Sequence, residues 1–171
     1  AISAAKYTNA QIIGIDISKG MLKIGEQKIA KKKLKERISL QLADSENLPF
    51  KTNSFNAITA GFGVRNFEHL KQGLQEMYRV LKEDGMVVIL EPSTPKYFPL
   101  KQLYSLYFHY ILPTIGAWVS KDTKAYTYLP NSVNDFPSGK DFILELEKVG
   151  FKKGKHIPLT FGIVSLYMAI K

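Results

Sequence analysis

Residues 11–16, Gln-Ile-Ile-Gly-Ile-Asp, form a short apolar run that ends in an acid, a pattern typical of a buried parallel strand. Ser18 follows and can cap the helix predicted over residues 19–33. Residues 38–43 then alternate apolar and polar side chains up to Asp44, which predicts a second strand. The strand–helix–strand order of this stretch favours an α/β fold built on a parallel sheet.

The alternation of strands and helices continues along the chain. Further strands are predicted over residues 55–62, 86–91, 151–160 and 161–170, helices over residues 70–81 and 139–149, and a turn at residues 83–85. Together these elements predict an open, mainly parallel sheet with helices on both faces.

The composition excludes several classes of protein. The chain has 171 residues, of which 45% are hydrophobic and 23% charged, and this predicts one folded domain over residues 1–171 rather than a disordered chain. It contains no cysteine, which excludes disulfides, thiolate zinc sites and cysteine nucleophiles and fits a reducing cytosol. No run of about twenty apolar residues is present to span a bilayer. We predict no metal site.

The net charge of +9 favours an anionic partner such as nucleic acid or a membrane surface. Nine Lys and Arg residues against three acids lie within residues 1–40. Cations near the end of the predicted 19–33 helix are explained by their favourable interaction with a helix C-terminus. Residues 28–37 contain no aromatic side chain to stack on bases, and the chain has no Asn/Asp-Pro-Pro-aromatic tetrad. We therefore expect no nucleic-acid binding.

Three acids stand where predicted strands end, namely Asp16, Asp44 and Glu91. Ligands of open parallel sheets bind at the carboxyl ends of the strands, and a carboxylate there can accept hydrogen bonds from both hydroxyls of a ribose. Each acid alone is better explained as a helix cap or a surface residue. As a set they favour a nucleoside-type ligand.

Several motifs resemble class I S-adenosylmethionine (SAM) methyltransferases: Asp16-Ile-Ser18 with Met21-Leu22, Ala43-Asp-Ser-Glu-Asn-Leu-Pro-Phe50, Phe55-Asn-Ala-Ile58 and Arg79-Val-Leu-Lys-Glu-Asp-Gly85. Further motifs are similar to the ubiquinone/menaquinone biosynthesis C-methyltransferase family: Phe62-Gly-Val-Arg-Asn66, Leu90-Glu-Pro-Ser-Thr-Pro95, His109-Tyr-Ile-Leu-Pro-Thr-Ile-Gly116, Tyr126-Thr-Tyr-Leu129 and Thr160-Phe-Gly-Ile-Val164. The resemblance covers nearly the whole chain, and the motif over residues 62–66 is its most specific part.

The resemblance implies a Rossmann-like fold with an antiparallel last strand, in which residues 97–137 form a helical and loop insertion on the substrate side. The family's first strand and its glycine-rich loop are absent from this chain and by position would precede Ala1. That strand lies in the middle of the sheet, so its absence would leave two strands without a shared hydrogen-bonding neighbour. We therefore expect the natural protein to carry a further segment that supplies it.

The resemblance also implies the residues that bind SAM. Asp16 would accept hydrogen bonds from the ribose hydroxyls, and Asp44 would contact the adenine amino group with the backbone amide of Ser45 nearby. Gly61, at the end of a predicted strand, would permit close approach of the cofactor, although it is equally explained as a bend in the strand. The family often has serine at this position, so this chain lacks that hydroxyl.

Arg65 and Asn66 would face the reacting ring of the acceptor. Arg65 would stabilise a developing phenolate or orient a water that acts as the base, and Asn66 would hold that water or the ring oxygen. A structural ion pair at a strand end is the alternative role for Arg65. His109 and His156 are other candidate bases because histidine titrates near neutral pH. His109 lies among aromatic residues, which favours a packed core side chain over a base.

These assignments predict SAM-dependent C-methylation of a demethylated polyprenyl quinol, with demethylmenaquinol favoured. The ring carbon, activated by its neighbouring hydroxyl, would attack the sulfonium methyl, S-adenosylhomocysteine would leave, and the ring would then lose a proton. The alternatives are a SAM methyltransferase for another small phenolic or lipid acceptor, and a non-catalytic protein that retains the fold.

Residues 97–119 are crowded with aromatic side chains and interrupted by Pro113 and Gly116. This composition suits contact with a prenyl tail or with a membrane interface, and it equally suits a core helix or a homodimer face. With the positive charge of the chain, we expect a cytoplasmic protein that docks transiently on the anionic inner face of the membrane, more weakly at high salt.

Overall fold

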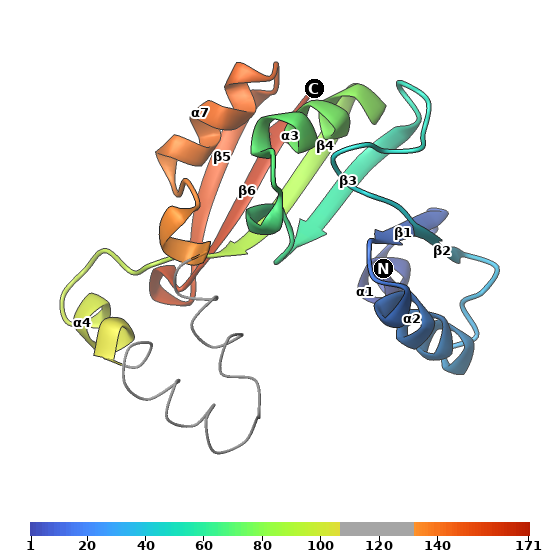
Figure 1. Cartoon of the computed structure of the whole chain (residues 1–171), viewed down its shortest axis with the longest axis horizontal. Coiled ribbons are helices and arrows are strands. Elements are labelled where there is room, and N and C mark those ends of the chain that lie inside the picture. Colours follow the sequence, from blue (N-terminus) through green and yellow to red (C-terminus); the bar gives the residue numbers. More distant parts are fainter. Residues whose placement is uncertain (107–131) are drawn as a thin grey trace. The chain divides into compact units, whose positions relative to one another are not determined.

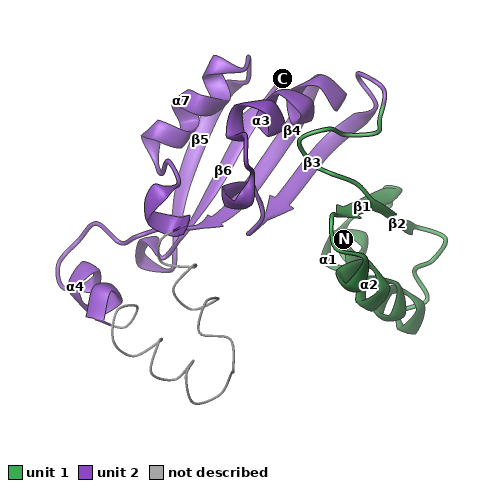
Figure 2. Cartoon of the chain, in the orientation of Figure 1, with its two compact units in different colours: residues 1–50 green, residues 51–171 purple. Residues whose placement is uncertain are grey.

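The computed structural model describes residues 1–106 and 132–171. The chain divides into two compact units, residues 1–50 and residues 51–171, and each contains its own sheet (Figures 1 and 2). The predicted α/β class is confirmed, but the strands form two sheets rather than one.

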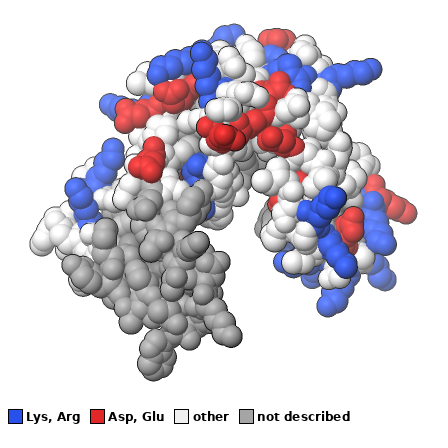
Figure 3. All heavy atoms as spheres, viewed as in Figure 1, with Lys and Arg blue, Asp and Glu red and all other residues white. Residues whose placement is uncertain are grey.

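The first unit is a small α/β layer. Its elements are α1 (Ile2–Tyr7), β1 (Ile12–Asp16), α2 (Lys19–Lys31) and β2 (Ile38–Leu42). The two strands are parallel and pair from Ile12 opposite Ile38 to Asp16 opposite Leu42. Helix α2 begins as predicted, because the Ser18 hydroxyl accepts a hydrogen bond from the amide of Met21 at 3.3 Å. Basic side chains gather over the surface of this unit in Figure 3.

The second unit contains a four-stranded mixed sheet in the order β3-β4-β6-β5. Its strands are β3 (Phe55–Gly61), β4 (Leu81–Pro92), β5 (Lys152–Leu159) and β6 (Val164–Ile170). Strands β3 and β4 are parallel, whereas β6 runs antiparallel to both β4 and β5. The parallel pair brings the carboxyl ends of β3 and β4 to the same edge of the sheet, next to the start of β6.

The helical elements of the second unit are η1 (Val64–Asn66), α3 (Leu70–Val80), α4 (Leu100–Leu106), α7 (Lys140–Lys148) and η3 (Thr160–Gly162). Helices α3 and α7 cover the same face of this sheet (Figure 1). The reason is the alternation of side chains along the strands. Ile89 of β4 and Tyr167 of β6 are paired and point to one side, where they pack with Leu74 of α3 and Phe142 of α7.

A second difference concerns residues 83–85, which the sequence predicts as a turn. The structure carries β4 through them as a bulge, and the pairing with β3 shifts from Phe55 opposite Leu81 to Ala57 opposite Met86. Asp84 has a φ of 60°, so the extra residues are taken up inside the strand and not in a separate loop. Turn-forming residues therefore mark an irregular strand here.

No helix among residues 1–106 and 132–171 is both long enough and apolar enough to cross a bilayer.

Candidate functional site

The most specific motif of the sequence, residues 62–66, forms the turn that leaves β3. The amide of Phe62 still donates to the carbonyl of Leu90 on β4 at 2.8 Å, and the chain then turns through Phe62 at a φ of 59°. The short η1 follows, closed by a hydrogen bond of 3.1 Å from the Asn66 amide to the Gly63 carbonyl. Arg65 and Asn66 are thus placed at the carboxyl end of β3, where parallel sheets bind ligands.

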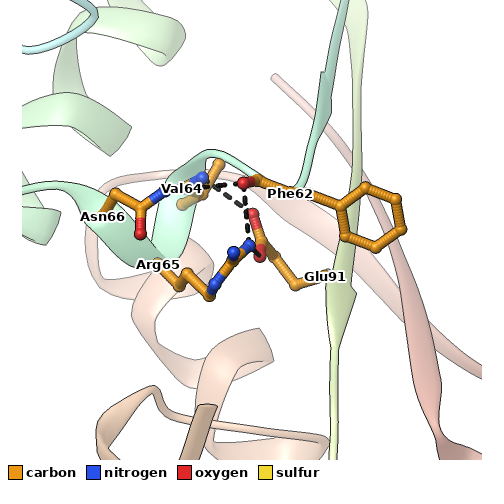
Figure 4. Close-up of polar contacts among 5 residues, drawn as sticks. All are labelled: Phe62, Val64, Arg65, Asn66 and Glu91. Carbon is orange, nitrogen blue, oxygen red and sulfur yellow. Dashed lines mark hydrogen bonds and ion pairs between the residues drawn. The ribbon is translucent and has the colours of Figure 1, made fainter. Parts of the chain in front are cut away.

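Glu91, near the end of β4, lies beneath this turn and is completely buried. Its Oε1 accepts a hydrogen bond from the backbone amide of Val64 at 2.7 Å, and its Oε2 accepts one from Nη1 of Arg65 at 2.9 Å (Figure 4). Nη1 of Arg65 also donates to the carbonyl of Phe62 at 2.7 Å. The structural ion pair considered for Arg65 is therefore present, and its partner is the acid that ends the neighbouring strand.

The Nε of Arg65 takes no part in these hydrogen bonds. Its Nε is buried and has no hydrogen-bond acceptor among the residues that the structure describes. A buried donor without an acceptor is unfavourable by about 1–3 kcal/mol.

Arg65 also lines a pocket of about 440 Å³, a volume within the usual range of small-molecule sites. The other polar side chains of its wall are Ser132 and Asp135. The remaining wall is apolar and consists of Val64, Phe67, Leu70, Phe136 and Pro137. An apolar ring that carries an oxygen suits such a lining.

Asn66 is exposed, and its Nδ2 lies 3.5 Å from the carbonyl of Phe62 (Figure 4). Gly61 closes β3, and a Cβ added to it would meet no atom within 4 Å. Space is therefore open beside Gly61, as close approach of a ligand to the backbone requires. Gly61, Arg65 and Asn66 are thus brought together at one strand end.

In the first unit, Asp16 is the last residue of β1, and Asp44 comes two residues after the end of β2, the strand that pairs with β1. The amide of Ala43, just beyond β2, donates to the carbonyl of Asp16 at 3.2 Å. Each carboxylate uses Oδ1 to accept from a backbone amide two residues on, Ser18 for Asp16 and Glu46 for Asp44, both at 2.8 Å. Ser45 lies within the second of these turns.

The second oxygen of each carboxylate, Oδ2, accepts no hydrogen bond from any residue in the described part of the chain. Two acceptors held at neighbouring strand ends suit ligand groups that can donate hydrogen bonds, such as ribose hydroxyls and an adenine amino group. The residues of this edge therefore fit the nucleoside part of SAM.

The two candidate histidines have different outcomes. His109 lies outside the described residues. His156, on β5, is held by a hydrogen bond between its Nε2 and the hydroxyl of Ser165 at 2.9 Å and is stacked on the ring of Tyr167. Burial lowers the pKa of the His156 imidazole below its ordinary value, and the charge of Lys96 lowers it further. These contacts give His156 a packing role.

Glu91 is the residue whose role sequence reasoning missed. It was expected to join Asp16 and Asp44 as a third ligand-binding acid, but both of its oxygens are used by Val64 and Arg65. The available signal was the parallel pairing of β3 and β4, which predicts that residues at the carboxyl ends of the two strands lie together.

The chain matches the ubiE/COQ5 methyltransferase family over residues 1–171. It is 48% identical over 161 residues to a demethylmenaquinone methyltransferase of Bacteroides fragilis, covering 94% of this chain and 66% of that protein. It is 46% identical over 170 residues to a ubiquinone/menaquinone biosynthesis C-methyltransferase UbiE of Geotalea daltonii, covering 99% and 72%.

A solved structure shows the same fold at low identity. A SAM-dependent methyltransferase from Aquifex aeolicus superposes with a TM-score of 0.66 at 16% identity, covering 94% of this chain and 68% of that one. The chain spans slightly less than two thirds of the length of the Bacteroides fragilis relative.

Proposed function

Because the chain belongs to the ubiE/COQ5 methyltransferase family, we propose that it carries out SAM-dependent methylation of a ring carbon in a demethylated polyprenyl quinol, in menaquinone or ubiquinone biosynthesis. The observation that carries the proposal is the guanidinium of Arg65, fixed at the end of β3 beside a largely apolar pocket. The name of the Bacteroides fragilis relative supports demethylmenaquinol as the favoured acceptor. When bound, SAM supplies an electrophilic methyl group on a sulfonium.

We assign the binding of SAM to Asp16, Asp44, Ser45 and Gly61. Oδ2 of Asp16 would accept from the ribose hydroxyls, and Oδ2 of Asp44 from the adenine amino group with the Ser45 amide beside it. Gly61 would leave room for the cofactor at the end of β3. The unused carboxylate oxygens and the open space at Gly61 support these assignments.

We assign the acceptor to Arg65 and Asn66. The N–H groups of Arg65 would stabilise negative charge on the ring oxygen while the neighbouring carbon becomes nucleophilic. Arginine does not itself remove protons at neutral pH, so Arg65 would orient a water and Asn66 would hold that water or the ring oxygen. His109 is the alternative base. Residues 97–137 would form the insertion on the substrate side.

The direct test is methyl transfer by the purified protein from isotopically labelled SAM to demethylmenaquinol, with the product followed by mass spectrometry. We expect one labelled methyl group on a ring carbon and calorimetric binding of SAM. A demethylated benzoquinol and a simple phenol are assayed in parallel. Comparison of the three acceptors shows whether the protein prefers a polyprenyl quinol or another small acceptor. Absence of SAM binding would support a non-catalytic protein and overturn the proposal.

A membrane contact is the second part of the proposal. Tyr97 and Phe98, just before α4, are 79% and 82% exposed. Leu103 and Leu106, within α4, are also exposed. Exposed aromatic side chains of this kind favour the interface of a bilayer, and the net positive charge of the chain favours anionic lipid. This surface would bring the protein to an acceptor whose prenyl tail lies in the membrane.

Replacing Tyr97 and Phe98 together by serine is expected to weaken binding to vesicles of anionic phospholipid at least tenfold, because burying one large apolar side chain is worth about 1.5–3 kcal/mol. Co-sedimentation with vesicles at low and high salt measures the effect, and added salt should weaken the binding of the unaltered protein. Tyr7→Ser, at a tyrosine that is 87% exposed in the first unit, is the matched control. A change in oligomeric state with unaltered vesicle binding would assign this surface to a homodimer.

A further inference from the structure

We infer that Glu91 is a positioning residue, which holds the Arg65 guanidinium in the orientation that the acceptor requires. The inference rests on the proposed function. Glu91 contributes a fully buried carboxylate from β4, and its two oxygens contact two consecutive residues of the neighbouring turn, the backbone of Val64 and the side chain of Arg65 (Figure 4).

The contacts of Arg65 fix its direction. Nη1 donates both to Oε2 of Glu91 at 2.9 Å and to the carbonyl of Phe62 at 2.7 Å. The guanidinium is planar and rigid, so fixing one nitrogen also fixes the direction of the N–H groups on the others. Nε and Nη2 carry the remaining N–H groups, and Nε has no acceptor in the described part of the chain.

Burial explains why the anchor is a carboxylate. The Arg65 side chain is only 11% exposed, and a cation removed from water needs a compensating charge. Glu91 supplies that charge from the next strand, so the guanidinium cannot turn toward solvent without leaving a buried anion unpaired. The arrangement keeps Arg65 along the wall of the pocket.

The position of the same side chain indicates that the anchor serves a ligand. Arg65 lines the pocket with Phe67, Leu70 and Phe136, and its buried Nε has no acceptor. An oxygen on an apolar ring, such as that of a quinol, matches an arginine set in a largely apolar lining.

The inference is tested with Glu91→Gln and Glu91→Asp in the methyl-transfer assay. Glu91→Gln keeps an oxygen for the Val64 amide but removes the charge that anchors Arg65. It should lower kcat by about tenfold or more, because the guanidinium loses its fixed direction. The Kd for SAM should stay within about twofold, because Glu91 only acts through Arg65. Glu91→Asp keeps the charge and should recover part of kcat.

A double variant separates positioning from simple loss of stability. In an Arg65→Gln background, adding Glu91→Gln should change kcat by less than about twofold, because residues that act as one unit are not additive. Tyr167→Phe is the structural control. The Tyr167 hydroxyl is buried and accepts from the Gly139 amide at 2.9 Å, so its loss should lower the melting temperature and leave the kcat of the folded protein unchanged.

Unaltered kcat in Glu91→Gln would overturn the inference, as would full additivity with Arg65→Gln or a loss that only follows the unfolded fraction. These outcomes require an active unaltered protein, so they leave the proposed function standing. An unaltered protein that binds SAM and transfers no methyl group would instead overturn the proposed function and the role of Glu91 with it.

Discussion

Replacing Arg65 by alanine is expected to lower the turnover of demethylmenaquinol by about 10²–10³-fold, the usual effect of removing one donor that stabilises developing negative charge. The Kd for SAM should change by less than about threefold, because the assigned cofactor contacts come from other residues. Single-turnover methyl transfer, with SAM binding measured separately by calorimetry, checks both expectations.

The control for this variant follows from the ion pair. Arg65→Ala leaves the buried Glu91 without its cation, which is expected to destabilise the fold by about 3–5 kcal/mol. Thermal unfolding must therefore be measured beside turnover. Arg65→Lys keeps the charge but loses the planar fork, so it should be more stable than the alanine variant and still slow. Equal loss of turnover and of SAM affinity would contradict the assignment of Arg65 to the acceptor.

Replacing Asp16 by alanine is expected to weaken SAM binding about 100-fold, which corresponds to about 3 kcal/mol. The reason is that a carboxylate accepting from two hydroxyls makes charge-assisted hydrogen bonds, which are stronger than neutral ones. Titration calorimetry of the purified protein with SAM measures the change. Turnover at saturating SAM should fall much less than affinity, because Asp16 is assigned to the cofactor and not to the acceptor.

Two variants control for local structure, because Asp16 also accepts from the amide of Ser18. Asp16→Asn keeps an oxygen for that amide and changes only the charge and Oδ2, so it should bind SAM nearly as weakly as the alanine variant. Ser18→Ala removes the cap of α2, which costs about 1 kcal/mol of stability, and should leave the Kd unchanged. Wild-type affinity in Asp16→Asn would argue against the ribose contact.

The elements that sequence reasoning located well are those fixed by local chemistry. The Ser18 cap, the end of β1 at Asp16 and the start of α3 after His69 all follow from residues within one turn of the boundary. The strand predicted over residues 55–62 is also confirmed, as β3, and it ends one residue earlier, at Gly61.

The features that were not predicted depend on contacts between distant residues. The bulge at residues 83–85 exists because β3 holds β4 on both sides of it, and without that pairing the same residues read as a turn. Helices α3 and α7 pack on the same face of the sheet because the pairing of β4 with β6 places their apolar side chains on that side. The anchor of Arg65 at Glu91 joins residues 26 positions apart, which no local pattern reveals.

The motifs over residues 90–95 and 160–164, far apart in the sequence, are in direct contact in the second unit. The amide of Ser93 donates to the carbonyl of Ile163 at 2.8 Å, and its hydroxyl donates to the carbonyl of Gly162 at 2.8 Å. The hydroxyl of Ser165 donates in turn to that of Ser93 at 2.9 Å. Residues 90–95 and 160–164 therefore hold each other at the strand ends beside Glu91.

The pairing of Glu91 with Arg65 has a consequence for discrimination between acceptors. Their opposite charges cancel in the resting protein, so the pocket wall offers oriented donors with little net attraction for an anion. A neutral acceptor is then not outcompeted by abundant cellular anions. The donors gain strength only as the ring oxygen acquires charge on the way to methylation, and interactions that grow in this way raise the rate rather than the affinity.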